Sequence, residues 1–524
     1  MSSKIGVIDV FAGPGGLGEG FSTFETGTGA RPFQIAVSAE MERSAHATLR
    51  LRAFFRLLDK EPGTLPKVYA DYLEKVARGT APPPEEYFDQ GPNSSNWKHA
   101  AGEALNLTLG EAGHNELLYD RIAAARRKYE TLVLIGGPPC QAYSLVGRAR
   151  QTNVPGFHTK GDKKHFLYRE YLQILAKFSP DVFIMENVKG ILSSSVGGRN
   201  MFEHIRRDLA RPSVAVGRST TGSSDPEYIL LPLHVPDGAV RDAALVDHDP
   251  SGFLIRCEQH GIPQARHRVI VMGIRAQANL LSNAKSTRGL RSAKAVSVSE
   301  AVAGLPALRS GVSRLQDDGK TWADEVEDQR RHVIRALGGA EDRQLAAILK
   351  NIRFSASLPR RATEYEGKAA GFSRKLRRPN QYLVTGHEAR SHMASDLGRY
   401  LYVAAFTQLH HRSPTSAEFP IALAPDHTNW FTGAFADRFR AQVEGNPANT
   451  VTSHLSKDGH AFIHWSLAQC RSLTPREAAR IQTFPDDYIF IGNRTQQYVQ
   501  VGNAVPPMLA KQIAEVVWSI LSGD

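Results

Sequence analysis

Short apolar runs alternate with helical patterns along the first half of the chain. Runs rich in β-branched and apolar residues predict buried strands at 4–11, 33–38, 131–135, 181–185 and 268–274. Helical patterns are found at about 41–58 and 166–178, and again at 474–483 and 507–521. Because each strand is too apolar to have a solvated face, the pattern predicts a parallel α/β sheet covered by helices on both faces.

The alternation stops after Arg275. We expect a first domain at 1–275, with an insertion at about 72–130 where proline-rich and polar loop sequences interrupt the pattern. A second, less regular region at 276–470 follows, and residues 471–524 return to complete the first domain. Residues 351–400 carry ten Lys or Arg and four Asp or Glu, so the positive charge is concentrated in the second region.

Charge and cysteine content limit the possible classes of protein. The 524 residues have a formal net charge of +11, which suggests a polyanionic partner such as nucleic acid, although basic proteins often carry such a charge without one. The three cysteines lie far apart, which excludes a disulfide framework and a paired-cysteine zinc site, and we assign no metal. The chain has no apolar run of about 18 residues and starts without a charged-then-apolar leader. We therefore expect a cytoplasmic protein without a membrane partner.

A glycine-rich turn follows the first predicted strand. Gly13, Gly15 and Gly18 satisfy the G-x-G-x-x-G spacing, and Glu40 lies at the end of the next strand. Such a turn lets the backbone approach a ligand closely, and the acidic side chain can bind both hydroxyls of a ribose. The pair indicates a nucleoside cofactor but does not separate NAD from S-adenosylmethionine. A glycine turn without a ligand stays open on this motif alone.

Three further motifs bring reactive side chains to the same sheet edge. A stiff Gly-Gly-Pro-Pro loop presents Cys140 as a candidate nucleophile, although a lone cysteine is more often a packing residue. Glu186 ends the strand at 181–185, as a candidate general acid or a simple helix-terminal charge. Gln264, Arg266 and Arg268 share one face as the chain enters a strand, which suits an anion or carbonyl oxygen or a solvated strand entrance. Cys257 and Cys470 have no comparable setting, and we interpret both as structural.

Taken together, these motifs resemble the DNA (cytosine-5)-methyltransferase family of bacterial restriction-modification systems. The resemblance rests on six motifs in the order of the family: DVFAGPGGLGEGF (9–21), GGPPCQAYS (136–144), ENVKG (186–190), QARHR (264–268), RSLTPREAARIQTFPDDY (471–488) and QYVQVGNAVPP (497–507). It covers most of 1–275 and 445–515 but not the middle of the chain. It implies a Rossmann-like S-adenosylmethionine-dependent domain with a smaller target-recognition domain.

The resemblance also implies a cofactor site for S-adenosylmethionine, whose product is S-adenosylhomocysteine. Phe11 would lie against the adenine, Glu40 on the ribose and Asp71 at the adenine amino group, and Asn503 would close the pocket. The expected cofactor residues are Phe11, Gly13, Gly15, Gly16, Glu40, Asp71, Pro138, Leu167, Asn503 and Val505.

For the chemistry, the resemblance implies that Cys140 adds to C6 of a flipped-out cytosine in double-stranded DNA. Glu186 would bind N3, and Arg266 and Arg268 would hold the O2 edge. The expected DNA-binding residues are Gln141, Ser144, Arg374, Lys375, Arg377, Arg378 and Thr450. For the basic run 374–378 a solvated loop stays an equal alternative. We expect a monomer that protects DNA beside a cognate restriction or defence nuclease.

Two other classes of function compete with this one. A nicotinamide or flavin oxidoreductase could use the same glycine turn, but it leaves the cysteine loop and the Gln-x-Arg-x-Arg motif unexplained. A catalytically silent DNA-binding relative is disfavoured because Cys140 and Glu186 are both present. The same chemistry on RNA stays open, although the long basic region suits reading of duplex base edges.

Overall fold

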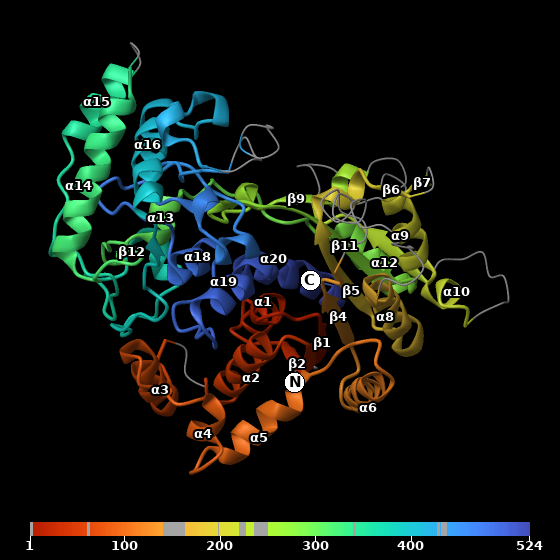
Figure 1. Cartoon of the computed structure of the whole chain (residues 1–524). Helices are drawn as coiled ribbons and strands as arrows, with labels where there is room; N and C mark the ends of the chain where they lie inside the picture. The colour runs from red at the N-terminus through yellow and green to blue at the C-terminus, as the bar shows by residue number, and fades with distance from the viewer. Residues whose placement is uncertain are drawn as a thin grey trace.

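The computed structural model describes residues 4–59, 63–139, 163–196, 199–218, 227–234, 250–338, 342–426, 430 and 438–523. Its centre is a sheet of order β3-β2-β1-β4-β5-β11-β8, with β9 paired to β11 (Figure 1). The strands are β1 (Ile5–Val10), β2 (Phe33–Glu40), β3 (Ala104–Asn106), β4 (Leu132–Gly136), β5 (Val182–Val188), β8 (Tyr228–Leu231), β9 (Leu254–Arg256) and β11 (His267–Arg275). All five strands predicted from the sequence are confirmed.

The prediction of a fully parallel sheet is wrong at one side. Strands β3, β2, β1, β4 and β5 are parallel, whereas β11 runs antiparallel to β5, β8 and β9. Only residues 257–266 connect β9 to β11, and a parallel pair needs a crossover of a dozen or more residues. The short connection therefore makes β11 antiparallel to β9.

Helices cover both faces of the sheet, as predicted. Along β1, Ile8 and Val10 pack into one core with α6, α8 and α9, whereas Ile5 and Val7 pack into the other with α1, α12 and α20. These and neighbouring helices are α1 (Gly16–Ser22), α2 (Arg43–Leu58), α6 (Ala112–Lys128), α8 (Lys163–Phe178), α9 (Met201–Ala210), α10 (Pro212–Ala215), α12 (Ala278–Ser286) and α20 (Pro507–Ser522). The helices predicted at 41–58, 166–178 and 507–521 are confirmed.

The insertion differs from its predicted bounds. Helices α3 (Lys67–Arg78), α4 (Pro84–Phe88) and α5 (Ser94–Glu103) pack their aromatic side chains with α2 in a separate core. In contrast, β3 and α6 belong to the main sheet and its cover. The additional structure is therefore α3–α5 rather than the whole of 72–130. Proline-rich loops flank these short helices and hide them in the sequence pattern.

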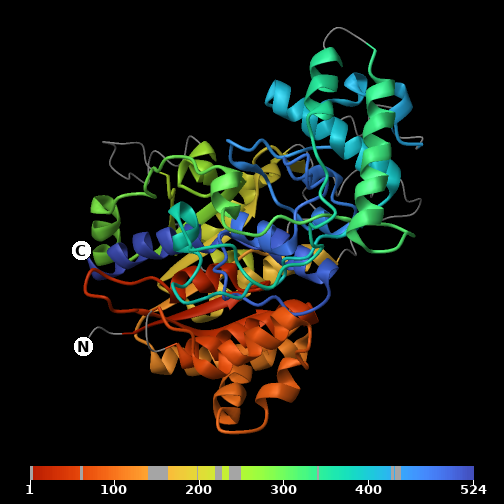
Figure 2. The ribbon, with the colours of Figure 1, turned by 90° about the vertical axis from the view of Figure 1, so that its left-hand side faces the viewer.

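A second domain is built around α14 (Gly319–Ala336), α15 (Asp342–Lys350) and α16 (Ala394–His410). Figure 2 shows these helices standing away from the sheet. The predicted boundary at 276 is too early, because Leu280 and Ala284 of α12 pack into the core of the sheet. A further core joins the two parts through α13 (Val298–Val302), α18 (Pro475–Ile481) and α19 (Arg494–Asn503), which confirms the helix predicted at 474–483.

The remaining short strands are β6 (Ser195–Val196), β7 (Arg199–Asn200), β10 (Gln264–Ala265), β12 (Gly311–Val312), β13 (Ser391–His392) and β14 (Ala448–Asn449). Among the helices that the structure describes, none is long and apolar enough to cross a membrane. Within the same described ranges, no group of three or more His, Cys, Asp or Glu side chains is arranged to hold a metal ion.

Candidate active site

A cavity of about 460 Å³ lies at the carboxyl ends of β1, β2, β4 and β5. Open α/β sheets bind their ligands at this edge. Of the predicted cofactor and catalytic residues, Phe11, Gly13, Glu40, Pro138, Leu167, Glu186, Arg266, Arg268, Asn503 and Val505 line it. Segments from both ends of the chain therefore form one site.

Positive φ angles and hydrogen bonds to one carboxylate define the conformation of the glycine turn. Gly13 and Gly15 have φ of 57° and 96°, and the non-glycine residue before them, Phe11, has φ of 55°. Glu40 accepts hydrogen bonds from the N–H groups of Gly13 (2.8 Å) and Glu42 (2.7 Å), and burial raises its pKa. Glu40 thus fixes the turn at the same time as it lines the cavity.

The C-terminal return closes the cavity behind the glycine turn. A Cβ atom placed on Gly16 would lie 2.2 Å from the carbonyl oxygen of Val505, and one on Gly15 would lie 3.0 Å from the Tyr488 hydroxyl. The Tyr488 hydroxyl in turn donates to the carbonyl of Pro14. Gly15 and Gly16 therefore act by allowing this close approach, rather than by lining the cavity as the cofactor contacts that the sequence predicted.

Glu186 and Arg268 form an ion pair on the cavity wall. Arg268 Nε lies 2.8 Å from Glu186 Oε1, and the two side chains are 14% and 13% exposed. Neighbouring Asn187 donates through Nδ2 to the carbonyl of Pro138 at 3.5 Å, which joins the end of β5 to the proline loop. The wall continues to Pro139; the predicted Cys140, Gln141 and Ser144 lie outside the described residues.

Arg266 hydrogen-bonds to two segments that are distant from it in the sequence, at Val451 and at Gly502. Its guanidinium is 1% exposed and donates to the carbonyls of Val451 (2.7 Å) and Gly502 (3.3 Å). Burial, with the nearby charge of Arg268, lowers its pKa to about 9. Sequence reasoning placed Arg266 with Arg268 on the substrate; the structure gives the two arginines different partners.

Thr450 is half-buried and has a hydrogen-bond partner within the protein. Its hydroxyl donates to the carbonyl of Ala265 at 2.6 Å, next to the parallel pairing of β10 with β14. Gln264 adds to this junction by accepting from the N–H of Val451 at 2.6 Å. The junction holds the end of the second domain against the strand that carries Arg268.

The prediction for Asp71 is wrong. Asp71 is on α3 of the insertion, where it forms an ion pair with Lys67 at 3.0 Å, and it does not line the cavity. The strand that precedes the expected position is β3, and Leu107 and Leu109 beyond it do line the cavity. With only three residues, β3 is too short to show a period in the sequence.

The basic run 374–378 divides into two pairs. Arg374 and Lys375 are exposed. Arg377 donates to the carbonyls of Gln381 and Gly367 and stacks on a tyrosine ring, whereas Arg378 forms ion pairs with Asp487 (2.6 Å) and Asp59 (3.1 Å). Arg377 and Arg378, which the sequence predicts as DNA contacts, thus have partners within the protein, whereas Arg374 and Lys375 are exposed.

Sequence reasoning also missed part of the lining. Met41, Leu107, Leu109, Thr452 and Ser453 contribute to the cavity without belonging to a recognisable motif. Cys257 and Cys470, interpreted as structural, are both buried, and burial raises the pKa of Cys257 to about 12. A thiol with such a pKa is a poor nucleophile at neutral pH.

The fold and the cavity define a Rossmann-like methyltransferase. The family model for the C-5 cytosine-specific DNA methylases matches residues 118–211 and 249–519. The chain therefore belongs to this family, and its enzymatic activity is that of a DNA (cytosine-5-)-methyltransferase.

Individual relatives agree with the family. The chain is 29% identical over 530 residues to the type II methyltransferase M.Bpa9945I of Bacillus paralicheniformis, with 99% of each chain covered. It is 26% identical over 423 residues to the type II methyltransferase M.AgeI of Thalassovita gelatinovora, covering 74% of this chain and 82% of the other. It is 25% identical over 422 residues to the DNA (cytosine-5-)-methyltransferase M.ApeKI of Aeropyrum pernix, covering 74% and 81%.

Proposed function

We propose that this enzyme transfers a methyl group from S-adenosylmethionine to C5 of a flipped-out cytosine in a specific double-stranded DNA site, through a covalent bond between Cys140 and C6. The observation that carries the proposal is the Glu186–Arg268 ion pair on the wall of the cavity, beside Pro138 and Pro139. The wall thus offers a carboxylate and a guanidinium next to the loop that continues into Cys140.

The cavity fits S-adenosylmethionine, which when bound supplies an electrophilic methyl group. Its volume of about 460 Å³ lies in the range of small-molecule sites, roughly 300–1,000 Å³. Phe11 and Leu167 give apolar surface for a planar ring, and the Glu40 carboxylate suits ribose hydroxyls. Glu40, Gly13, Asn503 and Val505 would hold the cofactor.

Cys140, Glu186 and Arg268 have different roles in the reaction at the cytosine base. The Cys140 thiolate adds to C6, which moves electron density to C5 and makes that carbon nucleophilic. Glu186 acts as a general acid: it donates a proton toward N3 as negative charge develops in the ring, while Arg268 keeps the Glu186 side chain in place. After C5 takes the methyl group, a base removes the C5 proton and the Cys140 sulfur leaves, which restores the ring.

A mechanism-based trap tests this chemistry. A base cannot remove fluorine from C5 as it removes a proton, so after methyl transfer DNA containing 5-fluorocytosine in the target site should remain covalently bound to the enzyme. Cys140→Ser should abolish the adduct and methylation while S-adenosylhomocysteine still binds. Bisulfite sequencing of DNA from expressing cells identifies the site beforehand. Methylation by Cys140→Ser at that site would refute the nucleophile assignment.

We further propose that the methylation protects host DNA against a cognate restriction or defence nuclease. The support is the full-length similarity to a relative named as a type II methyltransferase. DNA from cells that express the enzyme should resist a restriction nuclease that recognises the site methylated by the enzyme, and DNA from Cys140→Ser cells should be cut. Equal cutting of both DNAs would refute the protective role.

A further inference from the structure

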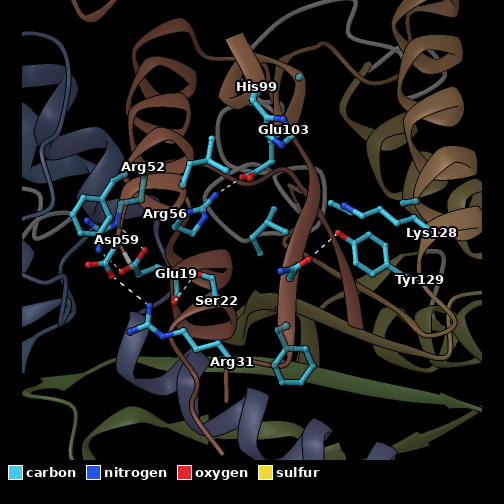
Figure 3. Close-up of a pocket in the computed structure, with 18 of the residues that line it drawn as sticks. Glu19, Ser22, Arg31, Arg52, Arg56, Asp59, His99, Glu103, Lys128 and Tyr129 are labelled. Atoms are coloured by element: carbon cyan, nitrogen blue, oxygen red, sulfur yellow. Dashed lines mark hydrogen bonds and ion pairs between the residues drawn. The ribbon is translucent and has the colours of Figure 1, made fainter. Parts of the chain in front are cut away.

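A second cavity, of about 680 Å³, lies over the first half of β2 (Figure 3). It is lined by Phe33, Gln34, Ile35 and Ala36 along the edge of β2 and by residues of α1, α2, α5 and α6. The cavity at the glycine turn lies at the other end of the same strand, at Ala39 and Glu40. The two cavities are therefore separate sites.

Basic side chains outnumber acidic ones around this second cavity. The basic residues are Arg31, Arg52, Arg56, Lys98, His99, Arg121 and Lys128, and the acidic ones are Glu19, Asp59 and Glu103. Three of the arginines already have carboxylate partners: Arg52 with Glu19 at 2.6 Å, Arg31 with Asp59 at 3.4 Å, and Arg56 with Glu103. Figure 3 marks the last two pairs with dashed lines.

The other three strong cations have no carboxylate within ion-pair distance in the part of the chain that the structure describes. Arg121 and Lys128 are seven residues apart on α6 and thus share one face, together with Ala124 and Ala125 of the lining. Lys98 belongs to α5, so the three cations come from two different helices.

We propose that this cavity binds a small molecule that carries two or more phosphoryl groups. Lys and Arg are the usual partners of phosphate oxygens, and three cations with no carboxylate partner match a multiply charged ligand better than a single carboxylate. The volume lies within the roughly 300–1,000 Å³ of small-molecule sites and exceeds the needs of one inorganic ion. The half-buried side chains of Ile35 and Ala36 add apolar surface to the lining for the rest of the molecule.

Chemical labelling of individual lysines tests where inorganic triphosphate binds. The enzyme is first saturated with S-adenosylhomocysteine, so that inorganic triphosphate cannot occupy the cofactor cavity, and is then treated with an amine-reactive reagent at constant ionic strength. At triphosphate concentrations about ten times the dissociation constant, labelling of Lys98 and Lys128 should fall about tenfold. Lys67 and Lys75 on α3 are exposed away from the cavity and should label at an unchanged rate.

Two arginines of α6, Arg121 and Arg127, provide a matched pair of variants. Arg121→Gln removes a cation from the cavity, and we expect about tenfold weaker protection by triphosphate. Arg127→Gln makes the same change on an exposed residue of α6 outside the cavity and should leave protection unaltered. Both variants should retain methylation, which shows that they fold. Absence of protection at Lys98 and Lys128, or equal weakening by the two variants, overturns the proposal.

Discussion

Gly16→Ala tests whether the C-terminal return forms the back of the cofactor site. The added methyl group would lie 2.2 Å from the carbonyl oxygen of Val505, a backbone atom that cannot rotate away. A carbon–oxygen contact needs roughly 1 Å more, so α1 and the Val505 segment must separate by about that amount. Overpacking of this kind costs about 1–3 kcal/mol, and the backbone contact places Gly16 near the upper end.

The same separation should also weaken ligand binding, because Val505 lines the cavity. We expect S-adenosylhomocysteine to bind Gly16→Ala about ten- to a hundredfold more weakly by calorimetry, as 1.4 kcal/mol corresponds to a factor of ten. Urea denaturation should show the loss of stability. Gly27→Ala is the matched control, since nothing lies within 4 Å of its added methyl group. If Gly16→Ala matches Gly27→Ala in both measurements, the close approach does not close the site.

Three further predictions concern charged groups. Glu186→Gln should lower turnover at least about a hundredfold in a methyl-transfer assay while S-adenosylhomocysteine binding persists, because the carboxylate acts on the base and not on the cofactor; equal loss of binding would contradict this. Arg378→Gln should lower the free energy of unfolding by about 1–3 kcal/mol, because it separates an ion pair whose partner Asp487 is 2% exposed, whereas Arg374→Gln should leave it unchanged; the assignment fails if the two variants unfold at the same urea concentration. Burial raises the pKa of Asp9 to about 8, against about 3.9 in the unfolded chain. The native state therefore binds one more proton between these values, and its stability falls as pH rises from about 4 through 8. In urea unfolding at pH 6 and pH 9, the wild type should lose free energy of unfolding between the two pH values, and Asp9→Asn should lack this part of the loss. If the free energy of unfolding of the wild type changes as little as that of Asp9→Asn, the raised pKa of Asp9 is contradicted.

The sequence predicts the parts of the fold whose pattern is local. The strand at 4–11 is recognisable because Ile5–Val10 are all buried between helical layers, and an apolar run reports that burial directly. The direction of β11 is not recognisable, because it depends on pairing with β9 and β5, which no single segment encodes. Strand β3 is too short to produce a pattern at all.

For the site, motif residues were predictable but their partners were not. Glu186 and Arg268 were expected at one sheet edge, and the structure adds the ion pair between them. Arg266 and Arg378 look like free cations in the sequence, yet each finds its partners more than a hundred residues away. Charge composition alone cannot distinguish a cation that awaits a phosphate from one that holds the protein together.

The contact between Gly16 and Val505 also has a consequence for biosynthesis. The cavity wall near the start of the chain is completed by Gly502, Asn503 and Val505, nearly 500 residues later. Because translation proceeds from the N-terminus, a nascent chain that lacks α19 and α20 also lacks the residues that complete the cavity beside the glycine turn. Such a chain should hold the cofactor poorly, so the enzyme begins to methylate only after these late helices have left the ribosome.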